Sequence, residues 1–283
     1  MALVIFCTAA NAQEEPEKKE SNQIDTIRVG NMIIVKDKSK ADNDRGNTHI
    51  SLDRHKKKIV SNVSTNWGVL DLGISNYDDQ TNYGSTGSYL FNRPGTVPLG
   101  KGDFKLRTGK SINVNIWFFM QRLNVIKHYV NLKYGLGLEL NNYRYKSSIS
   151  YKEQNPFTTP MVNSPIIFRD SISFSKNKLA ADYLTVPFML NLSTNPAYEN
   201  KGLSVSVGIS AGYLYSQRNK QVSDERGKKK NKGDYDLERF KYSYIAEVGL
   251  GPVRLYGSYS PKSMYVNGLD MRPYTVGIRL SNW

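Results

Sequence analysis

GLSVSVGISAGYLYS, residues 202–216, alternates apolar side chains with small or polar ones. Because successive side chains of a β-strand point to opposite faces, this stretch has one apolar face and one small, polar face. The apolar face would lie against the core of a soluble β-sandwich, but against lipid in a membrane β-barrel. The rest of the sequence has to decide which of these two surroundings the apolar face meets.

From Asn66 onward, eight stretches have the alternating pattern of a β-strand. They are residues 66–77, 111–122, 128–146, 177–193, 202–222, 237–251, 253–260 and 274–283. The links between them are alternately long and short: 78–110, 147–176 and 223–236 are long, 123–127, 194–201 and 251–252 are short, and 261–273 is intermediate.

An outer-membrane barrel has an even number of antiparallel strands, long outer loops and short periplasmic turns. The alternation of link lengths fits this rule when both termini are periplasmic, and a soluble sandwich gives no reason for it. The sequence therefore predicts an all-β fold, an eight-stranded antiparallel up-and-down transmembrane β-barrel over residues 66–283. Its apolar face would meet lipid in the cell outer membrane.

The overall composition is compatible with this prediction. The chain of 283 residues has 19 tyrosines, a residue that suits membrane interfaces as well as many soluble β-proteins. The mean hydropathy of −0.52 resembles that of a soluble protein, but a barrel hides its apolar band in the alternation. No run of about 18 uncharged apolar residues follows the N-terminus, which excludes a helical membrane protein.

The N-terminal residues 1–12 predict a signal peptide. Leu3 to Phe6 form a short apolar region, and Ala10-Asn11-Ala12 has the small-x-small form of a cleavage site. A basic region is missing before it, so the true translation start is open, and a short buried strand is the alternative. Cys7 is the only cysteine, so the mature chain would have no disulfide and no thiol chemistry.

Residues 13–65 predict a polar, flexible periplasmic arm. One segment, 25–37, has the pattern of a hairpin with Gly30-Asn31 at its turn. The net charge of +14 is concentrated in the runs 36–58 and 224–236, which we interpret as solvated loops. Attraction to anionic lipopolysaccharide or polysaccharide is the alternative, and no nucleic-acid-binding fold surrounds either run.

The polar faces of the predicted strands carry six charged residues that would lie inside the barrel. A barrel of eight strands is just wide enough for side chains to fill it, and buried charges need partners. Glu247 and Arg254 flank the Gly251-Pro252 turn, and Asp71 and Arg279 could pair where the first and last strands meet. We interpret the set as a plug of ion pairs, with a proton or ion path as the alternative: Asp71, Lys133, Glu139, Glu247, Arg254 and Arg279.

The chain resembles the outer-membrane β-barrel proteins of the Bacteroidetes that are called PorT-like. The resemblance lies in DTIRVGNMIIVKD (25–37) with the basic stretch after it, in NWGVLDLGISNY (66–77), and in the C-terminal residues 251–283. It covers most of residues 24–283 and implies an outer-membrane location and an eight-stranded barrel. It implies little about activity, because its motifs are those of barrel geometry.

No catalytic constellation, metal-ligand spacing or cofactor motif stands out, so we expect neither an enzyme nor a cofactor. The three histidines, His49, His55 and His128, fall in the arm and on a predicted short turn, away from the long loops. The expected function is a structural or surface-interaction barrel. A narrow pore, a secretion-associated barrel and a soluble lipocalin-like binding barrel remain as alternatives.

The long loops would then contact a surface glycan or a protein partner, while the barrel contacts outer-membrane lipid and lipopolysaccharide. Aromatic residues in these loops could stack on a sugar or a partner, although loop packing or an interface girdle is the simpler interpretation. They are Tyr83, Tyr89, Phe91, Tyr151, Phe157 and Phe168.

Overall fold

The structure is a computed structural model, and it describes residues 24–29, 32–37, 49–52, 61–158, 164–195, 202–250 and 253–281. The chain divides into two compact units, Met1–Lys58 and Ile59–Trp283. The predicted signal peptide and the predicted turns at Gly30-Asn31 and Gly251-Pro252 lie outside the described residues. Within those residues, no helix is long and apolar enough to cross a membrane.

The first unit contains a small antiparallel sheet. Its strands β1 (Ile24–Val29) and β2 (Met32–Asp37) pair over the segment that was predicted to be a hairpin. A third strand, β3 (His49–Leu52), pairs with β2. β3 was not predicted, because the charged residues around it mask a segment that is too short for a clear period.

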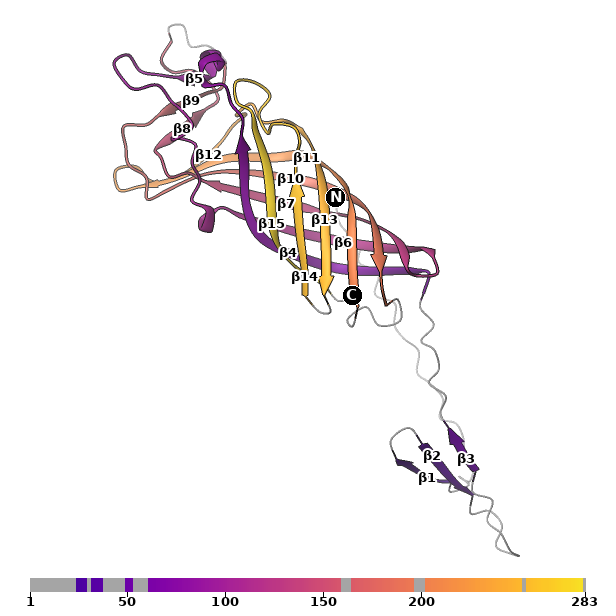
Figure 1. Ribbon diagram of the computed structural model, residues 1–283. Helices are drawn as coiled ribbons and strands as arrows, with labels where there is room; N and C mark the ends of the chain where they lie inside the picture. Colours follow the sequence, from indigo (N-terminus) through magenta and orange to yellow (C-terminus); the bar gives the residue numbers. More distant parts are fainter. Residues whose placement is uncertain are drawn as a thin grey trace, which may run out of the picture. The chain divides into compact units, whose positions relative to one another are not determined.

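The second unit is built on one large antiparallel sheet, and each of the eight predicted stretches overlaps one of its long strands. These strands are β4 (Val63–Asp79), β6 (Ile112–Ile126), β7 (Val130–Arg144), β10 (Lys176–Ser193), β11 (Leu203–Ser223), β13 (Phe240–Leu250), β14 (Val253–Tyr259) and β15 (Met271–Leu280). They pair in the order β10-β7-β6-β4-β15-β14-β13-β11, and β10 also pairs with β11 (Figure 1).

The two faces of this sheet have the opposite polarity from a water-soluble protein. The exposed face of β10 carries five large apolar side chains that are 40% to 53% exposed: Leu184, Val186, Phe188, Leu190 and Leu192. The alternate residues on the same strand, such as Thr185 and Asn191, are 1% exposed. Large apolar side chains are therefore outside and polar side chains are inside, along most of the sheet.

A bulge changes the faces of β6. The register between β6 and β7 shifts between Trp117 and Phe119, so Trp117 and Met120 both point to the buried face, at 5% and 0% exposure. Strict alternation from the exposed Ile112 and Ile116 predicts that Met120 is exposed too, and this prediction is wrong. On the paired strand, Gly68 has a φ of +69°, and β4 changes its faces at the same level, since Asn66 and Val69 are both buried.

The long links fold together at one end of the large sheet (Figure 1). We call the described residues of 80–111, 145–175, 224–239 and 260–270 the head. The head contains a small sheet in which β5 (Leu90–Phe91) pairs in parallel with β9 (Ile166–Arg169), and β9 pairs antiparallel with β8 (Ile149–Lys152). Short 3₁₀ helices lie at Tyr83–Ser85, Gly87–Tyr89 and Thr108–Lys110. Its buried core is rich in tyrosine and includes Tyr89, Phe104, Tyr145, Ile149, Tyr151, Tyr235 and Tyr265.

The basic run 224–236 belongs partly to a strand. β12 (Gly227–Lys232) pairs with the outer part of β11, from Arg218 to Ser223. The interpretation of this run as a solvated loop was wrong for these residues. Lysine and glycine are poor strand formers in isolation, so the pattern gave no sign that β11 would extend far enough to pair with them.

Candidate functional site

Six charged residues from five different strands meet on the buried face of the large sheet. They are Asp71 on β4, Lys133 and Glu139 on β7, Glu247 on β13, Arg254 on β14 and Arg279 on β15, and none is more than 7% exposed. These are the six residues that the sequence had placed there, because each lies out of phase with the apolar face of its strand.

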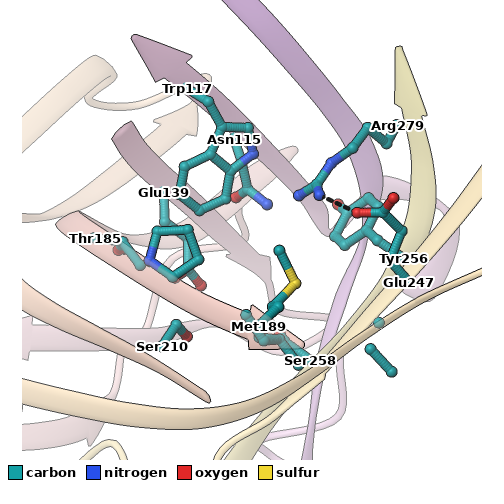
Figure 2. Close-up of a pocket in the computed structure, with 14 residues that line it drawn as sticks. Asn115, Trp117, Glu139, Thr185, Met189, Ser210, Glu247, Tyr256, Ser258 and Arg279 are labelled. Carbon is teal, nitrogen blue, oxygen red and sulfur yellow. Dashed lines mark hydrogen bonds and ion pairs between the residues drawn. The ribbon is translucent and has the colours of Figure 1, made fainter. Parts of the chain in front are cut away.

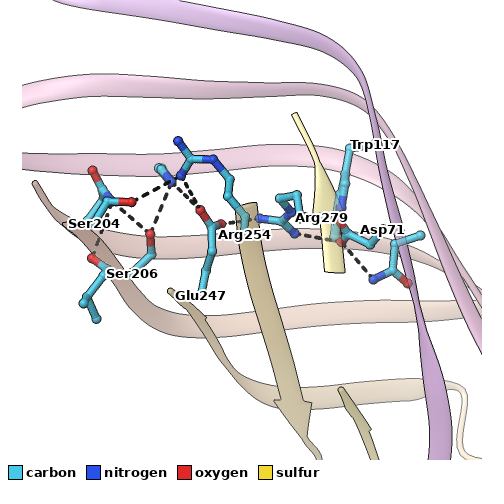
Figure 3. A network of polar contacts seen from close by, with 11 residues as sticks. Asp71, Trp117, Ser204, Ser206, Glu247, Arg254 and Arg279 are labelled. Carbon is cyan, nitrogen blue, oxygen red and sulfur yellow. Dashed lines mark hydrogen bonds and ion pairs between the residues drawn. The ribbon is translucent and has the colours of Figure 1, made fainter. Parts of the chain in front are cut away.

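Arg279 is the centre of the larger of two clusters (Figure 3). Its Nε donates to Asp71 Oδ1 at 2.7 Å, and its Nη2 donates to Asp71 Oδ2 at 2.8 Å. Its Nη1 donates to Glu247 Oε2 at 2.5 Å. The planar guanidinium thus bridges two carboxylates from two other strands, which the single ammonium of a lysine could not do with the same fixed geometry.

These two carboxylates also have other partners. Glu247 Oε1 accepts hydrogen bonds from Lys133 Nζ at 2.9 Å and from Arg254 Nη1 at 3.1 Å. Asp71 Oδ2 accepts from Trp117 Nε1 at 2.7 Å and from Asn115 Nδ2 at 3.1 Å. Such full hydrogen bonding offsets the cost of placing charges away from water.

Glu139 belongs to a second cluster. It accepts a hydrogen bond from Lys241 Nζ, with which it forms a salt bridge, and others from Asn141 Nδ2 at 2.9 Å and Thr185 Oγ1 at 3.4 Å. Lys241 was missed in the sequence, although it lies on β13 an even number of residues from Glu247 and therefore on the same face. With Lys241, the two clusters contain three acids and four bases.

The space between the two clusters is small (Figure 2). A cavity of about 30 Å³ lies among Trp117, Glu139, Met189, Glu247 and Arg279. This volume is enough for about one water molecule, not for a solute. The described residues include no group of three His, Cys, Asp or Glu side chains that could hold a metal ion. The arrangement is thus that of a filled, ion-paired interior.

The head places the predicted contact aromatics in two different surroundings. Tyr89, Tyr151 and Phe168 are buried, so they pack within the head and offer no contact surface. The Tyr89 hydroxyl donates to the Tyr235 carbonyl at 2.7 Å, and the Tyr151 hydroxyl lies 2.8 Å from that of Tyr265. For these three, stacking on a partner is ruled out and the simpler interpretation, loop packing, fits, because the long links build a core of their own.

Tyr83, Phe91 and Phe157 are more accessible. Tyr83 is half-buried and donates to Asp79 Oδ2 at 2.8 Å. Phe91 and Phe157 stack with ring centroids 4.5 Å apart, and Phe157 is 41% exposed. Of the six predicted aromatics, this stacked pair is the one that the structure leaves available for contact.

A hollow of about 250 Å³ lies beside this pair, and two arginines that the sequence analysis had not selected line it. The Arg93 guanidinium lies 5.5 Å from the ring centre of Phe157 and 5.9 Å from that of Phe168. Arg169 pairs with Asp103 through its Nη2, at 2.7 Å. The hollow therefore combines the Phe91 ring and two arginines with the Asp170 carboxylate, a mixed lining that suits sugar-like groups.

Comparison with known proteins gives a family and a distant structural likeness. The model of the family described as outer membrane protein beta-barrel domain matches residues 59–261. Ail, the attachment invasion locus protein of Yersinia pestis, is a similar solved structure, with 10% identity, a TM-score of 0.30, and coverage of 76% of this chain and 98% of that one. No curated protein matches the sequence.

Proposed function

This chain belongs to the family of outer membrane proteins with a β-barrel domain, and from that premise we propose that it is a non-enzymatic, eight-stranded transmembrane barrel. In this proposal the barrel lies in the outer membrane, and the head is an extracellular surface for contact with other molecules. The observation that carries the proposal is the inverted polarity of the large sheet, with an apolar exposed face and an ion-paired buried face.

Closure of the sheet is supported by its pairing. Each of the eight long strands has two antiparallel neighbours among them, because β10 pairs with β7 on one side and with β11 on the other. A transmembrane sheet needs such closure, since lipid offers no hydrogen bonds to the free groups of an edge strand. β12 pairs with β11 only beyond the apolar part of the sheet, where water can hydrogen-bond to the free backbone groups of β12.

The orientation follows from the links. β4 begins and β15 ends at the same end of the sheet as the short link between β6 and β7, and the head is at the other end. Short turns face the periplasm in outer-membrane barrels. The proposal therefore puts the termini of this unit in the periplasm and the head outside the cell.

The filled interior favours a structural barrel over a pore. Buried ion pairs and Trp117 occupy the level at which a channel would have to pass, and the cavity there has a volume of only about 30 Å³. A lipocalin-like barrel would turn its apolar face inward, whereas here that face is exposed. Contact through the head, at the Phe91–Phe157 pair and Arg93, is the role that remains, with an anionic glycan or a protein as the partner.

Two finer points are also proposals. The match of motifs at 25–37, 66–77 and 251–283 supports membership of the PorT-like branch of the Bacteroidetes barrels. The pattern of residues 1–12 supports export by a signal peptide, with residues 13–65 as a periplasmic arm.

The first test is membrane fractionation of cells that express the full chain, followed by SDS gels of heated and unheated samples. We expect the chain in the outer-membrane fraction and a mobility shift on heating, because folded barrels resist SDS. A chain that is found in the soluble periplasmic fraction and shows no shift would overturn the proposal.

The orientation can be tested with single cysteines, since Cys7 is the only native one and lies in the predicted signal peptide. Lys101→Cys puts a thiol on the head, and Tyr129→Cys puts one in the short link between β6 and β7; both positions are exposed. A membrane-impermeant maleimide should label intact cells only at position 101. Labelling of position 129 in intact cells, with none at position 101, would reverse the orientation.

A further inference from the structure

Basic residues from four neighbouring strands lie in one row on the exposed side of the sheet, where the sheet meets the head. The register pairs Arg144 on β7 with Lys178 on β10, Lys178 with Lys220 on β11, and Lys220 with Lys230 on β12. Residues that lie directly opposite each other in antiparallel strands point to the same face, with Cβ atoms about 4.5–5.5 Å apart. The four basic side chains thus form a continuous row.

Further basic residues border this row. Lys176 and Lys228 lie on one side of it and Arg218 and Lys232 on the other, because they are two residues away on the same strands. We call these eight residues the basic ladder: Arg144, Lys176, Lys178, Arg218, Lys220, Lys228, Lys230 and Lys232.

Carboxylates do not neutralise most of the ladder. Asp182 is buried and pairs with Arg218, at 2.5 Å. Within the part of the chain that the structure describes, none of the six ladder lysines forms a salt bridge, and Lys178 donates to the neutral amide oxygen of Asn142. Asp224 and Glu225 are in the turn between β11 and β12, beyond the end of the ladder.

The like charges repel one another. Lys176 and Lys228 lower the pKa of Lys220, which lies beyond the apolar part of β11. Like charges directly opposite each other destabilise a sheet, and here a whole extra strand, β12, brings lysines into the row. A bound anion would remove this repulsion.

The ladder also lies at a definite level. The apolar exposed face of β7 ends at Leu140, and Arg144 lies four residues further along the strand. At about 3.3 Å per residue and a tilt of about 45°, this is roughly 9 Å above the hydrocarbon region. The headgroup layer on each side of a bilayer is about 5–8 Å thick, so lysine side chains from the ladder can reach the phosphate groups within it.

From this geometry we propose that the basic ladder is a binding site for the phosphate groups of lipids in the outer leaflet. The site rests on the proposed outer-membrane position of the sheet. We choose lipid rather than a soluble polyanion because, on β7, β10 and β11, the ladder lies within about six residues of the apolar exposed face of the same strand. On β11, the exposed Tyr213 and Tyr215 lie between the apolar band and Arg218, as interface aromatics do.

The test uses the full chain, folded in a neutral maltoside detergent and titrated with diphosphorylated lipid A under native mass spectrometry. The triple variant Lys178→Gln/Lys220→Gln/Lys230→Gln removes the row from three strands. Each lysine near an anionic lipid surface contributes to the binding free energy. The loss of three lysines should therefore lower the affinity of the triple variant for lipid A about a hundredfold. Lipid A without its phosphates should bind the unmodified chain as weakly as the variant binds the phosphorylated form.

The matched control is Lys101→Gln/Lys105→Gln/Lys110→Gln, which removes the same charge from exposed positions of the head outside the ladder. Its affinity should stay within about twofold of the unmodified chain, because the ladder itself keeps all of its charges. An equal loss in both triple variants would show an effect of net charge and would overturn the proposal. So would equal binding of dephosphorylated lipid A.

Inorganic tripolyphosphate distinguishes a lipid from a soluble anion. If it competes with lipid A at an equal phosphate concentration, the ladder is a general polyanion site and the lipid assignment is wrong. The SDS heat shift is measured on every variant. A chain that keeps its heat shift but binds no lipid A contradicts this inference alone, whereas a chain without the shift contradicts the proposed barrel itself.

Discussion

Arg279 is the residue whose removal should cost the folded state most, because among the described residues it is the cation that forms a salt bridge with Asp71. In the variant Arg279→Met, Asp71 would keep only the hydrogen bonds from Trp117 and Asn115. Glu247 would keep Lys133 and Arg254. Removal of one member of a buried ion pair costs about 3–5 kcal/mol, since it leaves a charge without compensation. We expect a loss of this size in the free energy of unfolding.

The double variant Arg279→Met/Asp71→Asn separates the loss of charge compensation from the loss of packing. It removes both charges, and the asparagine oxygen can still accept the hydrogen bond from Trp117. Replacement of a whole buried pair by neutral groups is often close to neutral, so we expect the double variant to recover at least about half of the loss.

The assay is urea unfolding in detergent micelles, followed as the fraction that migrates as folded protein on unheated SDS gels. This readout avoids Trp117 fluorescence, which the substitutions themselves would change. A loss below about 1 kcal/mol for Arg279→Met would place the pair in the range of solvated surface ion pairs. A double variant that is no more stable than the single one would refute the argument from an unpaired Asp71.

Three further predictions follow from the same structure. Phe188→Arg, at a 53% exposed position, should lower the free energy of unfolding in lipid by about 2–4 kcal/mol. The loss is measured as a lower refolding yield of the variant in vesicles, and an unchanged yield would indicate that this face meets water. Gly208→Ala should cost about 1–3 kcal/mol in urea titrations, because a Cβ there would lie 2.1 Å from the Phe188 carbonyl oxygen, while Gly100→Ala, in open space, should change little. Burial raises the pKa of the Tyr145 hydroxyl to about 12. The neutral hydroxyl therefore stabilises the fold fully below the pKa of about 10 that tyrosine has in the unfolded chain, and this contribution is lost as the pH rises through about 12. Phenolate absorbance should rise in two steps, and a single step near pH 10 would contradict the buried tyrosine core.

The strands of the large sheet could be predicted because their two faces differ in chemistry along almost their whole length. The period of two then assigned each charged residue to its face, and Lys241 could have been assigned by the same rule. The bulge at Trp117 could not be predicted, because three large apolar residues in a row, Trp117 to Phe119, fit either face.

The head could not be predicted from any period. Its core comes from links without regular alternation, and tyrosines such as Tyr151 and Tyr265 meet only after the chain has folded, from positions that are far apart in sequence. The lysines of β12 could not be predicted to form a strand either. Their strand exists because β11 extends beyond the apolar band and offers them an edge, and a charge run by itself indicates only exposure to water.

Where the membrane would end can be worked out separately from the two faces of the sheet. On β7, the exposed face changes from Leu140 to Asn142, and the buried face changes from Asn141 to Tyr143. On β10, which pairs with it, the apolar face changes from the exposed Leu184 to Asp182, which is buried against Arg218, and the opposite face changes from Thr185 to Tyr183.

Both faces change at one level, and the physical reason differs for each. Below this level, lipid outside the sheet gives no hydrophobic drive toward the interior, so hydrogen bonds and ion pairs such as Glu139–Lys241 hold the strands together. Above it, water surrounds the strands, and burial of tyrosines stabilises the head in the usual way. A soluble β-sandwich would show one polarity throughout, so the shared boundary argues for a sheet that passes from lipid into water.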